Sequence, residues 1–178
     1  QMPIIIYNDD IINKQFRPIS LADQYGENYN KALLEYLIVN YIKMREEFNE
    51  GSFDILSLNQ RIEKISNNSN NKVSREYKQL MRPNNQNNPV NIIGKDGKRI
   101  VKISSFRFIE PVVADNQSLP NKARVKLAIY DKKFTTDFEQ QNWQIDISFT
   151  FAGIVINNQN NEINLPKFLV TEYQISKL

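Results

Sequence analysis

The chain has 178 residues, of which 40% are hydrophobic and 24% are charged, and its formal net charge is +3. This length and composition fit one globular domain with a substantial buried core. The chain contains no cysteine and no histidine, which excludes disulfides, thiol nucleophiles, a Ser-His-Asp triad and the usual zinc sites. The mild positive charge permits an acidic partner but does not by itself argue for nucleic acid.

Residues 1–27 are predicted to form an extended lead-in. The segment Pro3–Tyr7 is typical of a short strand, and Gly26 interrupts the chain before the next element. The start Gln1-Met2-Pro3 is unusual for a natural protein, so we expect a fragment of a longer one. No stretch reaches the roughly 18–20 apolar residues needed to span a bilayer.

A long helix is predicted from Asn28 to Asn49. Its apolar side chains recur at steps of three and four over more than one face, so the helix must be covered on several sides. Charges crowd the segment Lys43–Glu47, and this end is therefore expected to reach solvent. Near the other end, Tyr29 and Leu33 are either core residues or contacts to a second copy of the chain.

Three residues near the end of this helix are candidate site residues. We expect Tyr41 to be a core residue whose hydroxyl is hydrogen-bonded. Arg45 and Glu46 have two interpretations: a helix-end charge pair bonded to the sheet or to the last helical carbonyls, or charges in a groove or interface, where arginine is favoured.

Two shorter helices are predicted to follow. Ser52 or Asp54 can cap the first, whose one-sided apolar stripe consists of Ile55, Leu58, Ile62 and Ile65. The second runs from about Val73 to Met81 and stops before Pro83. Residues 84–89 are expected to be irregular.

The hydrophobic period changes after residue 90. The segment Gly94–Gly97 is interpreted as a hairpin turn entering a strand that ends at Ile109; it lacks the spacing of a phosphate-binding loop. Residues 123–130 and 142–151 alternate between apolar and polar, and residues 168–175 form a last strand. The alternation places Asp146 on the solvent face, opposite Trp143.

This order predicts an α+β fold in a single domain, residues 1–178. A long N-terminal helix and two shorter helices, within residues 28–83, would pack on a curved antiparallel sheet of about four strands, within residues 90–178.

Four local sequences resemble those of one protein family. The long helix ends in Tyr41-Ile42-Lys43-Met44-Arg45-Glu46-Glu47-Phe48, and Tyr77-Lys78-Gln79-Leu80-Met81 precedes Asn/Pro-rich residues. Trp143 opens the central strand, and the last motif reads Asn164-Leu165-Pro166-Lys167-Phe168-Leu169-Val170-Thr171-Glu172-Tyr173. In this order they resemble the periplasmic domain of the inner-membrane subunit of bacterial type IV secretion systems, the product of the eighth gene of the VirB operon.

The resemblance runs from about Pro3 to Ile175 and implies a cone-shaped fold like that of nuclear transport factor 2. It implies a non-enzymatic assembly component, without cofactor or metal, that forms dimers or larger oligomers and contacts other subunits of the inner-membrane and core complex. It also implies a membrane helix upstream of Gln1, a periplasmic location for this domain, and at most transient contact with DNA.

The chain departs from the family in the last motif, where Leu165 and Lys167 replace a proline and a glycine. Lysine replaces glycine poorly where the backbone needs positive φ or a close approach. Because the family's motif is linked to self-association, this change calls the usual dimer contact into question. The candidate contact residues of the motif are Asn164, Leu165, Pro166, Lys167, Thr171 and Glu172.

Two alternatives remain open at this stage. The same cone fold serves small-molecule-binding proteins and isomerase-type enzymes, which pair a carboxylate base with a donor such as tyrosine. The absence of histidine, and of a lone Asp or Glu on the inward face of a strand, argues against such an enzyme here. A conjugation or plasmid-transfer relative of the same fold would differ only in genome context.

Overall fold

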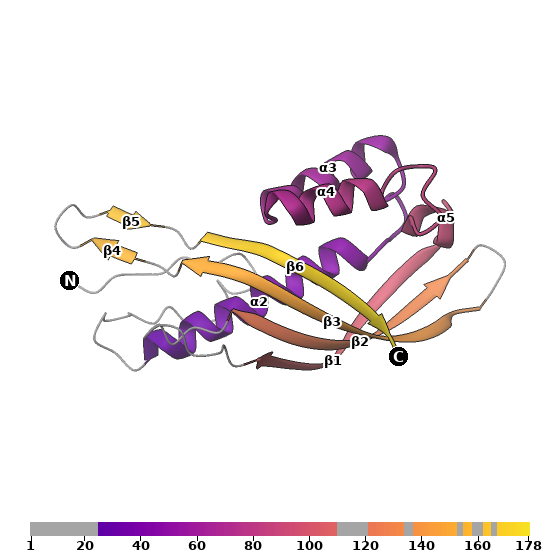
Figure 1. Ribbon diagram of the computed structural model, residues 1–178. Helices are drawn as coiled ribbons and strands as arrows, with labels where there is room; N and C mark the ends of the chain where they lie inside the picture. Colours follow the sequence, from indigo (N-terminus) through magenta and orange to yellow (C-terminus); the bar gives the residue numbers. More distant parts are fainter. Residues whose placement is uncertain (1–24, 110–120, 134–136, 153–154, 158–161, 165–166) are drawn as a thin grey trace.

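Figure 1 shows the computed structural model, which describes residues 25–109, 121–133, 137–152, 155–157, 162–164 and 167–178. For residues 25–30, 152, 155–157 and 162–164 the description covers only the backbone. The predicted strand at Pro3–Tyr7 and the rest of the lead-in up to residue 24 lie outside the described residues.

The described chain begins with helices. Their bounds are α2 (Tyr25–Glu46), α3 (Ile55–Asn67), α4 (Asn71–Leu80) and α5 (Pro89–Ile93). The long helix therefore begins and ends three residues before its predicted limits. As predicted, Asp54 caps α3, accepting a hydrogen bond from the Ser57 N–H at 2.9 Å. None of the helices in the described part of the chain is long and apolar enough to cross a membrane.

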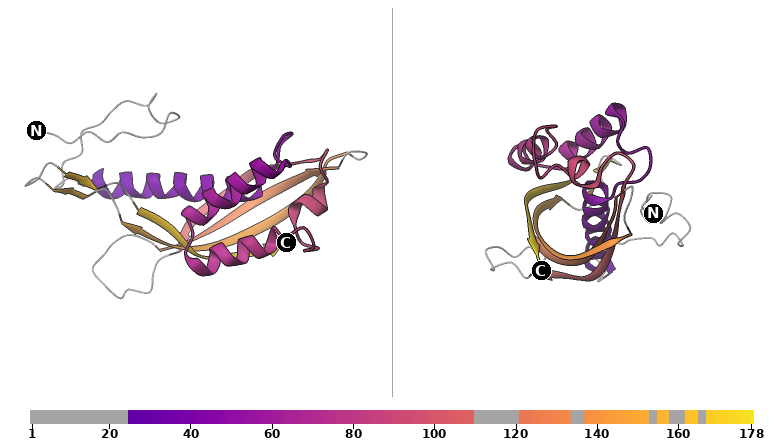
Figure 2. Two further views of the ribbon diagram at one scale, coloured as in Figure 1. Left: turned by 90° about the horizontal axis from the view of Figure 1, so that it is seen from above. Right: turned by 90° about the vertical axis from the view of Figure 1, so that its right-hand side faces the viewer.

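The strands follow and form a four-stranded antiparallel sheet in the order β1-β2-β3-β6. Their bounds are β1 (Lys98–Ile109), β2 (Lys122–Lys132), β3 (Glu139–Ala152) and β6 (Lys167–Lys177). A separate two-stranded sheet, β4 (Val155–Asn157) with β5 (Glu162–Asn164), was not predicted. Figure 2 shows the main sheet curving around α2, with α3 and α4 on one side of the molecule. The predicted α+β architecture is confirmed.

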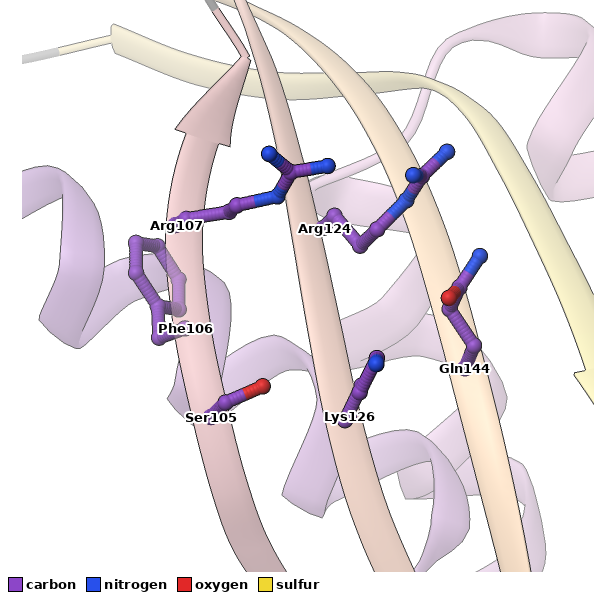
Figure 3. A pocket seen from close by; sticks show the side chains of 6 residues that line it. All are labelled: Ser105, Phe106, Arg107, Arg124, Lys126 and Gln144. Atoms are coloured by element: carbon purple, nitrogen blue, oxygen red, sulfur yellow. The ribbon is translucent and has the colours of Figure 1, made fainter.

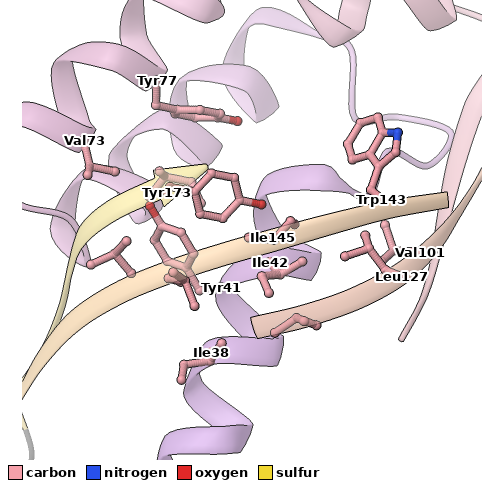
Figure 4. Packing of buried hydrophobic residues seen from close by; sticks show 14 of the residues in the cluster. Ile38, Tyr41, Ile42, Val73, Tyr77, Val101, Leu127, Trp143, Ile145 and Tyr173 are labelled. Atoms are coloured by element: carbon pink, nitrogen blue, oxygen red, sulfur yellow. The ribbon is translucent and has the colours of Figure 1, made fainter. Parts of the chain in front are cut away.

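The core fills the space between α2 and the concave face of the sheet (Figure 4). Leu34, Ile38 and Ile42 of α2 are completely buried, and each contributes about 1.5–3 kcal/mol through removal of its apolar surface from water. The alternation predicted for residues 123–130 and 142–151 is observed, because the inward positions are buried and the outward positions remain accessible.

The segment before β1 differs from its prediction. Residues 89–93 form the short helix α5, with Asn88 as its N-cap and Pro89 at its first turn. Gly94, at φ +83°, ends this helix, so Gly94–Gly97 joins a helix to a strand and is not a hairpin turn. A side chain at Gly97 would lie 2.6 Å from Ile93 and 2.7 Å from the carbonyl oxygen of Lys132, so the close packing of α5 on β2 requires glycine there.

The predicted apolar stripe of α3 is buried only at its C-terminal end. Ile65 is completely buried, Leu58 and Ile62 are half-buried, and Ile55 is 79% exposed. The helix begins at Ile55, and its first turn extends beyond the elements that cover the rest of the stripe. Helical periodicity identified the correct face but not how far along the helix that face is covered.

Candidate functional site

The charged end of α2 reaches solvent only in part: Lys43 is exposed and Glu47 half-buried, but Arg45 and Glu46 are buried, which contradicts the prediction for these two residues. The exposed fractions of Arg45 and Glu46 are 6% and 3%. The chain leaves α2 along the sheet, where Phe48 and Arg99 exchange backbone hydrogen bonds of 3.1 and 2.8 Å. Arg61 of α3 closes the opposite side, since its guanidinium donates to the carbonyl of Met44 in the last turn of α2 and to that of Glu47 just after it. Solvent is therefore excluded from Arg45 and Glu46.

Four charged side chains meet at this point and form a buried charge network: Arg45, Glu46, Arg99 and Asp131. Nε of Arg45 lies 3.7 Å from Oε1 of Glu46, and Nη1 of Arg99 lies 3.8 Å from Oε2 of the same carboxylate. Arg99 also donates two hydrogen bonds to Asp131, at 2.6 and 2.8 Å. Two cations and two anions compensate each other, so the network carries no formal net charge, as a buried ionic cluster requires.

Hydrogen bonds extend from this network across α2. The Ser69 hydroxyl donates to the carbonyl of Ile65, so its single proton is used. The Tyr41 hydroxyl, 2.8 Å from Ser69 Oγ, therefore donates to Ser69 and accepts from Arg45 at 3.5 Å. Tyr41 is 2% exposed. The prediction that it is a core residue with a hydrogen-bonded hydroxyl is confirmed.

Two tyrosine rings, Tyr77 and Tyr173, contact the Arg45 guanidinium. Figure 4 shows these two rings beside α2. The central carbon of the guanidinium lies 3.8 Å from the ring centroid of Tyr173 and 4.8 Å from that of Tyr77, within cation–π range. The Tyr173 hydroxyl donates to Glu46 at 3.0 Å. The Tyr77 hydroxyl is buried and interacts with the Arg61 guanidinium, but it forms no hydrogen bond of good geometry among the described residues.

Burial raises the pKa values of both phenols. The pKa of Tyr77 rises to about 12, chiefly through burial and against the opposing charge of Arg61. The pKa of Tyr173 lies well above its ordinary value, first because of burial and then because of the Glu46 charge. Both rings therefore remain neutral at any physiological pH.

A second forked Arg–Asp pair lies on the opposite face of the sheet. Arg124 of β2 faces Asp146 of β3 directly in the register and donates to it at 2.8 and 3.1 Å. Their side chains are 33% and 30% exposed. The predicted position of Asp146 on the solvent face is confirmed.

A hollow of about 350 Å³ lies beside this pair (Figure 3). Figure 3 shows its side chains on strands β1, β2 and β3, with the helices behind the sheet. The hollow therefore lies on the outer face, away from the core. Its lining residues are Ser105, Phe106, Arg107, Arg124, Lys126 and Gln144.

The remaining predicted contact residues are dispersed. Leu33 is buried, with 8% exposed. In the last motif Lys167 and Glu172 are exposed and Thr171 is half-buried, while Leu165 and Pro166 lie outside the described residues. The side chains of Tyr29 and Asn164 also lie outside the description. The role of all these residues in self-association stays a prediction.

Asp131 is an acidic residue on the inward face of a strand, 4% exposed, but it is paired with Arg99 and is therefore not a lone inward acid. Its carboxylate is held by both hydrogen bonds from Arg99. Glu46, the other buried acid, contacts Arg45, Arg99 and Tyr173. Because both are bound by cations inside packed protein, their geometry is that of a structural network. The described residues contain no group of acidic side chains that could hold a metal ion.

Arg99 and Asp131 were not among the predicted site residues. A signal existed for Asp131, because it continues the inward series Ala123, Val125, Leu127 and Ile129 by one further step of two. The same step of two places Arg99 on the same face of β1 as Val101, which is buried. Neither signal reveals the partner, since Arg99 and Asp131 are brought together only by the register of β1 with β2.

Comparison with known proteins places this fold among type IV secretion components. A family model described as VirB8 protein matches residues 12–177. The structure of Agrobacterium tumefaciens VirB8 protein superposes with a TM-score of 0.62 at 17% identity, covering 83% of this chain and 92% of that one. The soluble domain of TrwG from Bartonella grahamii superposes with a TM-score of 0.58 at 17% identity, covering 83% of this chain and 94% of that one. CagV from Helicobacter pylori, a VirB8 homologue, superposes with a TM-score of 0.56 at 14% identity, covering 83% of this chain and 98% of that one. Among curated proteins, no sequence matches the chain.

Proposed function

This chain belongs to the VirB8 protein family, and from that premise we propose that it is an assembly component of a bacterial type IV secretion system. It acts by holding other subunits and copies of itself rather than by catalysis. The observation that carries this proposal is the family match over residues 12–177, because it spans both the helices and the whole main sheet. The charge network supports it, since the buried acids Glu46 and Asp131 are bound to arginines and serve packing.

The proposed function includes the cellular location of this domain. The domain lies in the periplasm and is anchored in the inner membrane by a helix upstream of residue 1. This part rests on the resemblance described for the sequence. A fusion of the full-length gene product to a reporter that is active only in the periplasm tests it, and activity of a cytoplasmic reporter at the same C-terminal position would contradict it.

The family role is tested by deletion of the gene in its source bacterium. Transfer of the secreted substrate should be lost and should return when the full-length gene is supplied in trans. A charge-network variant, Arg99→Ala, should fail to restore transfer because the domain no longer folds stably, whereas exposed Gln60→Ala on α3 should restore it. Unimpaired transfer in the deletion strain would refute the proposed function.

Self-association can be tested cleanly because the chain has no cysteine. Ala32 is exposed on α2 and lies three residues from Tyr29, hence on the same helical face. An Ala32→Cys variant should form a disulfide-linked dimer under mild oxidation if this face meets a second copy. Glu63→Cys, exposed on α3, is the matched control. Equal cross-linking by both variants would indicate random collision and exclude this face as the contact.

A further inference from the structure

The outer face of the main sheet carries a concentration of cations on its first two strands. These are Lys98, Lys102 and Arg107 of β1, and Lys122, Arg124, Lys126 and Lys132 of β2, which we call the basic face. The only acidic side chain within β1 and β2 is Asp131, and it is buried on the inward side. The basic face is therefore not neutralised from within its own two strands.

The register makes this arrangement costly. Lys98 lies directly opposite Lys132, and Arg107 lies directly opposite Arg124. Like charges in directly opposed cross-strand positions destabilise a sheet. Asp146 compensates the charge of Arg124 through two hydrogen bonds. Among the described residues, however, no carboxylate lies within ion-pair distance of Arg107 or Lys126. An anionic partner would turn this repulsion into attraction.

The hollow provides a specific place for an anionic group. Figure 3 shows the Arg107 side chain extending toward β2, on the same side of the sheet as Arg124 and Lys126. Ser105 and Gln144 supply neutral hydrogen-bonding groups at its edge. A free guanidinium binds a carboxylate through two parallel hydrogen bonds, and a neighbouring ammonium adds charge without fixed geometry.

The exposed aromatic rings of this region argue against single-stranded nucleic acid as the occupant. Lys102 lies 5.3 Å from the ring of Tyr130. Lys98 and Lys132 lie 5.4 and 5.6 Å from the ring of Phe138. The rings of Tyr130 and Phe138 already contact ammonium groups, and the Phe106 ring at the hollow packs at a right angle to that of Phe108, with centroids 5.0 Å apart. Binding of single strands depends instead on ring faces that are free to stack on bases.

The spacing of the cations favours an extended polypeptide. Lys122, Arg124 and Lys126 occupy successive same-face positions of β2, and such positions repeat about every 6.6–6.8 Å along a strand. Alternate acidic residues of an extended peptide repeat at the same interval. The sheet curves around α2, so its outer face is convex (Figure 2), and a planar bilayer surface would contact only part of it.

We propose that the basic face docks an extended acidic segment of another protein, with Arg107 and Lys126 binding its carboxylates at the hollow. This refines the proposed function, on which it rests for the class of partner, by naming the chemistry of one contact. The segment is bound by charge and strand-like spacing, so its affinity falls as salt concentration rises.

The probe for this proposal is a fluorescein-labelled peptide of alternating glutamate and threonine, twelve residues long like β1. Fluorescence anisotropy should show salt-sensitive binding to the wild-type domain. The double variant Arg107→Glu/Lys126→Glu should bind about tenfold more weakly or worse. The matched control Lys72→Glu/Lys78→Glu changes the net charge equally on the exposed side of α4 and should bind within about twofold of wild type.

Thermal unfolding separates binding from folding. Because Arg107 faces Arg124, its reversal to glutamate should leave Tm unchanged or raise it. A lower Tm would show that the charge is structural and would overturn the proposal. Arg107→Gln/Lys126→Gln should give a smaller loss of binding than the charge reversal, and no loss would also overturn it.

The other occupants are outcomes of the same assay. Equal weakening by both charge-reversal variants would show that only net charge matters. Tighter binding of a thymidine oligonucleotide of the same length, or of phosphatidylglycerol vesicles, with the same dependence on Arg107 and Lys126 would assign the face to nucleic acid or lipid instead. If the peptide fails to bind but substrate transfer still requires the gene, the docking surface is refuted and the proposed function stands. Peptide binding without any role in transfer refutes the proposed function alone.

Discussion

The two forked Arg–Asp pairs allow the effect of burial on an ion pair to be measured within one sheet. Arg99 faces Asp131 across β1 and β2, and Arg124 faces Asp146 across β2 and β3. The first pair has distances of 2.6 and 2.8 Å and the second 2.8 and 3.1 Å. Their burial differs greatly, since the side chains of the first pair are 3% and 5% exposed and those of the second 33% and 30%.

Asp131→Asn keeps the shape of the side chain and removes its charge, so Arg99 loses its closest counter-charge. Breaking a buried pair in this way costs about 3–5 kcal/mol in the free energy of unfolding. Arg99 retains Glu46 at 3.8 Å, so the lower value, about 3 kcal/mol, is expected. With an m-value of about 2 kcal/mol/M, the urea midpoint should fall by about 1.5 M.

The single tryptophan, Trp143, reports this unfolding by its fluorescence, since Arg99 lies 5.0 Å from its ring. Asp146→Asn is the matched control, and its midpoint should hardly move, because solvent and salt screen an accessible pair. Equal shifts for the two variants would refute the argument that burial sets the cost. An Arg99→Met/Asp131→Leu variant should regain most of the lost stability, because apolar residues of similar size require no compensating charge.

Three further predictions concern neighbouring residues. Tyr77→Phe should leave thermal stability nearly unchanged, because among the described residues the Tyr77 hydroxyl forms no hydrogen bond of good geometry. Tyr41→Phe should cost about 0.5–1.5 kcal/mol in chemical denaturation, because it breaks the bond to Ser69. Tyrosine side chains ionise near pH 10 in an unfolded chain, whereas burial raises the pKa of Tyr77 to about 12 and that of Tyr173 well above normal. The free energy of unfolding should therefore be unaffected by these two groups below pH 10 and should fall as the pH rises toward about 12. The absorbance of these two tyrosinates should develop only together with the loss of circular dichroism. Arg61→Ala should lower the free energy of unfolding by about 1.5–3 kcal/mol, because carbonyls at the end of α2 lose a charged donor; an unchanged urea midpoint would show that water replaces it fully.

Much of the fold follows from local rules that act within one element. Strict alternation identified β2 and β3 because one face of each is buried and the other is wet. Asp54 marked the start of α3 because its side chain satisfies a free N–H of the first turn. The start of α5 carried an equally local signal, Asn88 followed by proline at the first helical position, but five helical residues show no periodicity from which to recognise a helix.

The candidate site was less predictable because it depends on long-range contacts. The charges after Met44 are typical of a solvent-exposed helix end, and nothing in that segment indicates that Arg61 and Arg99 close over it. Arg99 and Asp131 are 32 residues apart in sequence, and only the pairing of two strands brings them together. Likewise, the basic face arises because the register of β1 and β2 aligns cations that are unremarkable in each strand alone.

Two backbone bridges, one on each side of α3, bear on how the sheet avoids aggregation. The outer strands β1 and β6 each receive one short bridge from the helical segment: Phe48 pairs with Arg99, and Ser69 pairs with Val170. On β6, the Val170 amide and carbonyl bond to Asn68 and Asn70 at 2.8 and 2.9 Å. Without these bridges, the backbone groups of Arg99 and Val170 would be left unpaired on the outer edges, where they could join the strands of neighbouring molecules. The connections on either side of α3 therefore occupy one backbone position on each outer strand, at which a strand of a neighbouring molecule would otherwise pair.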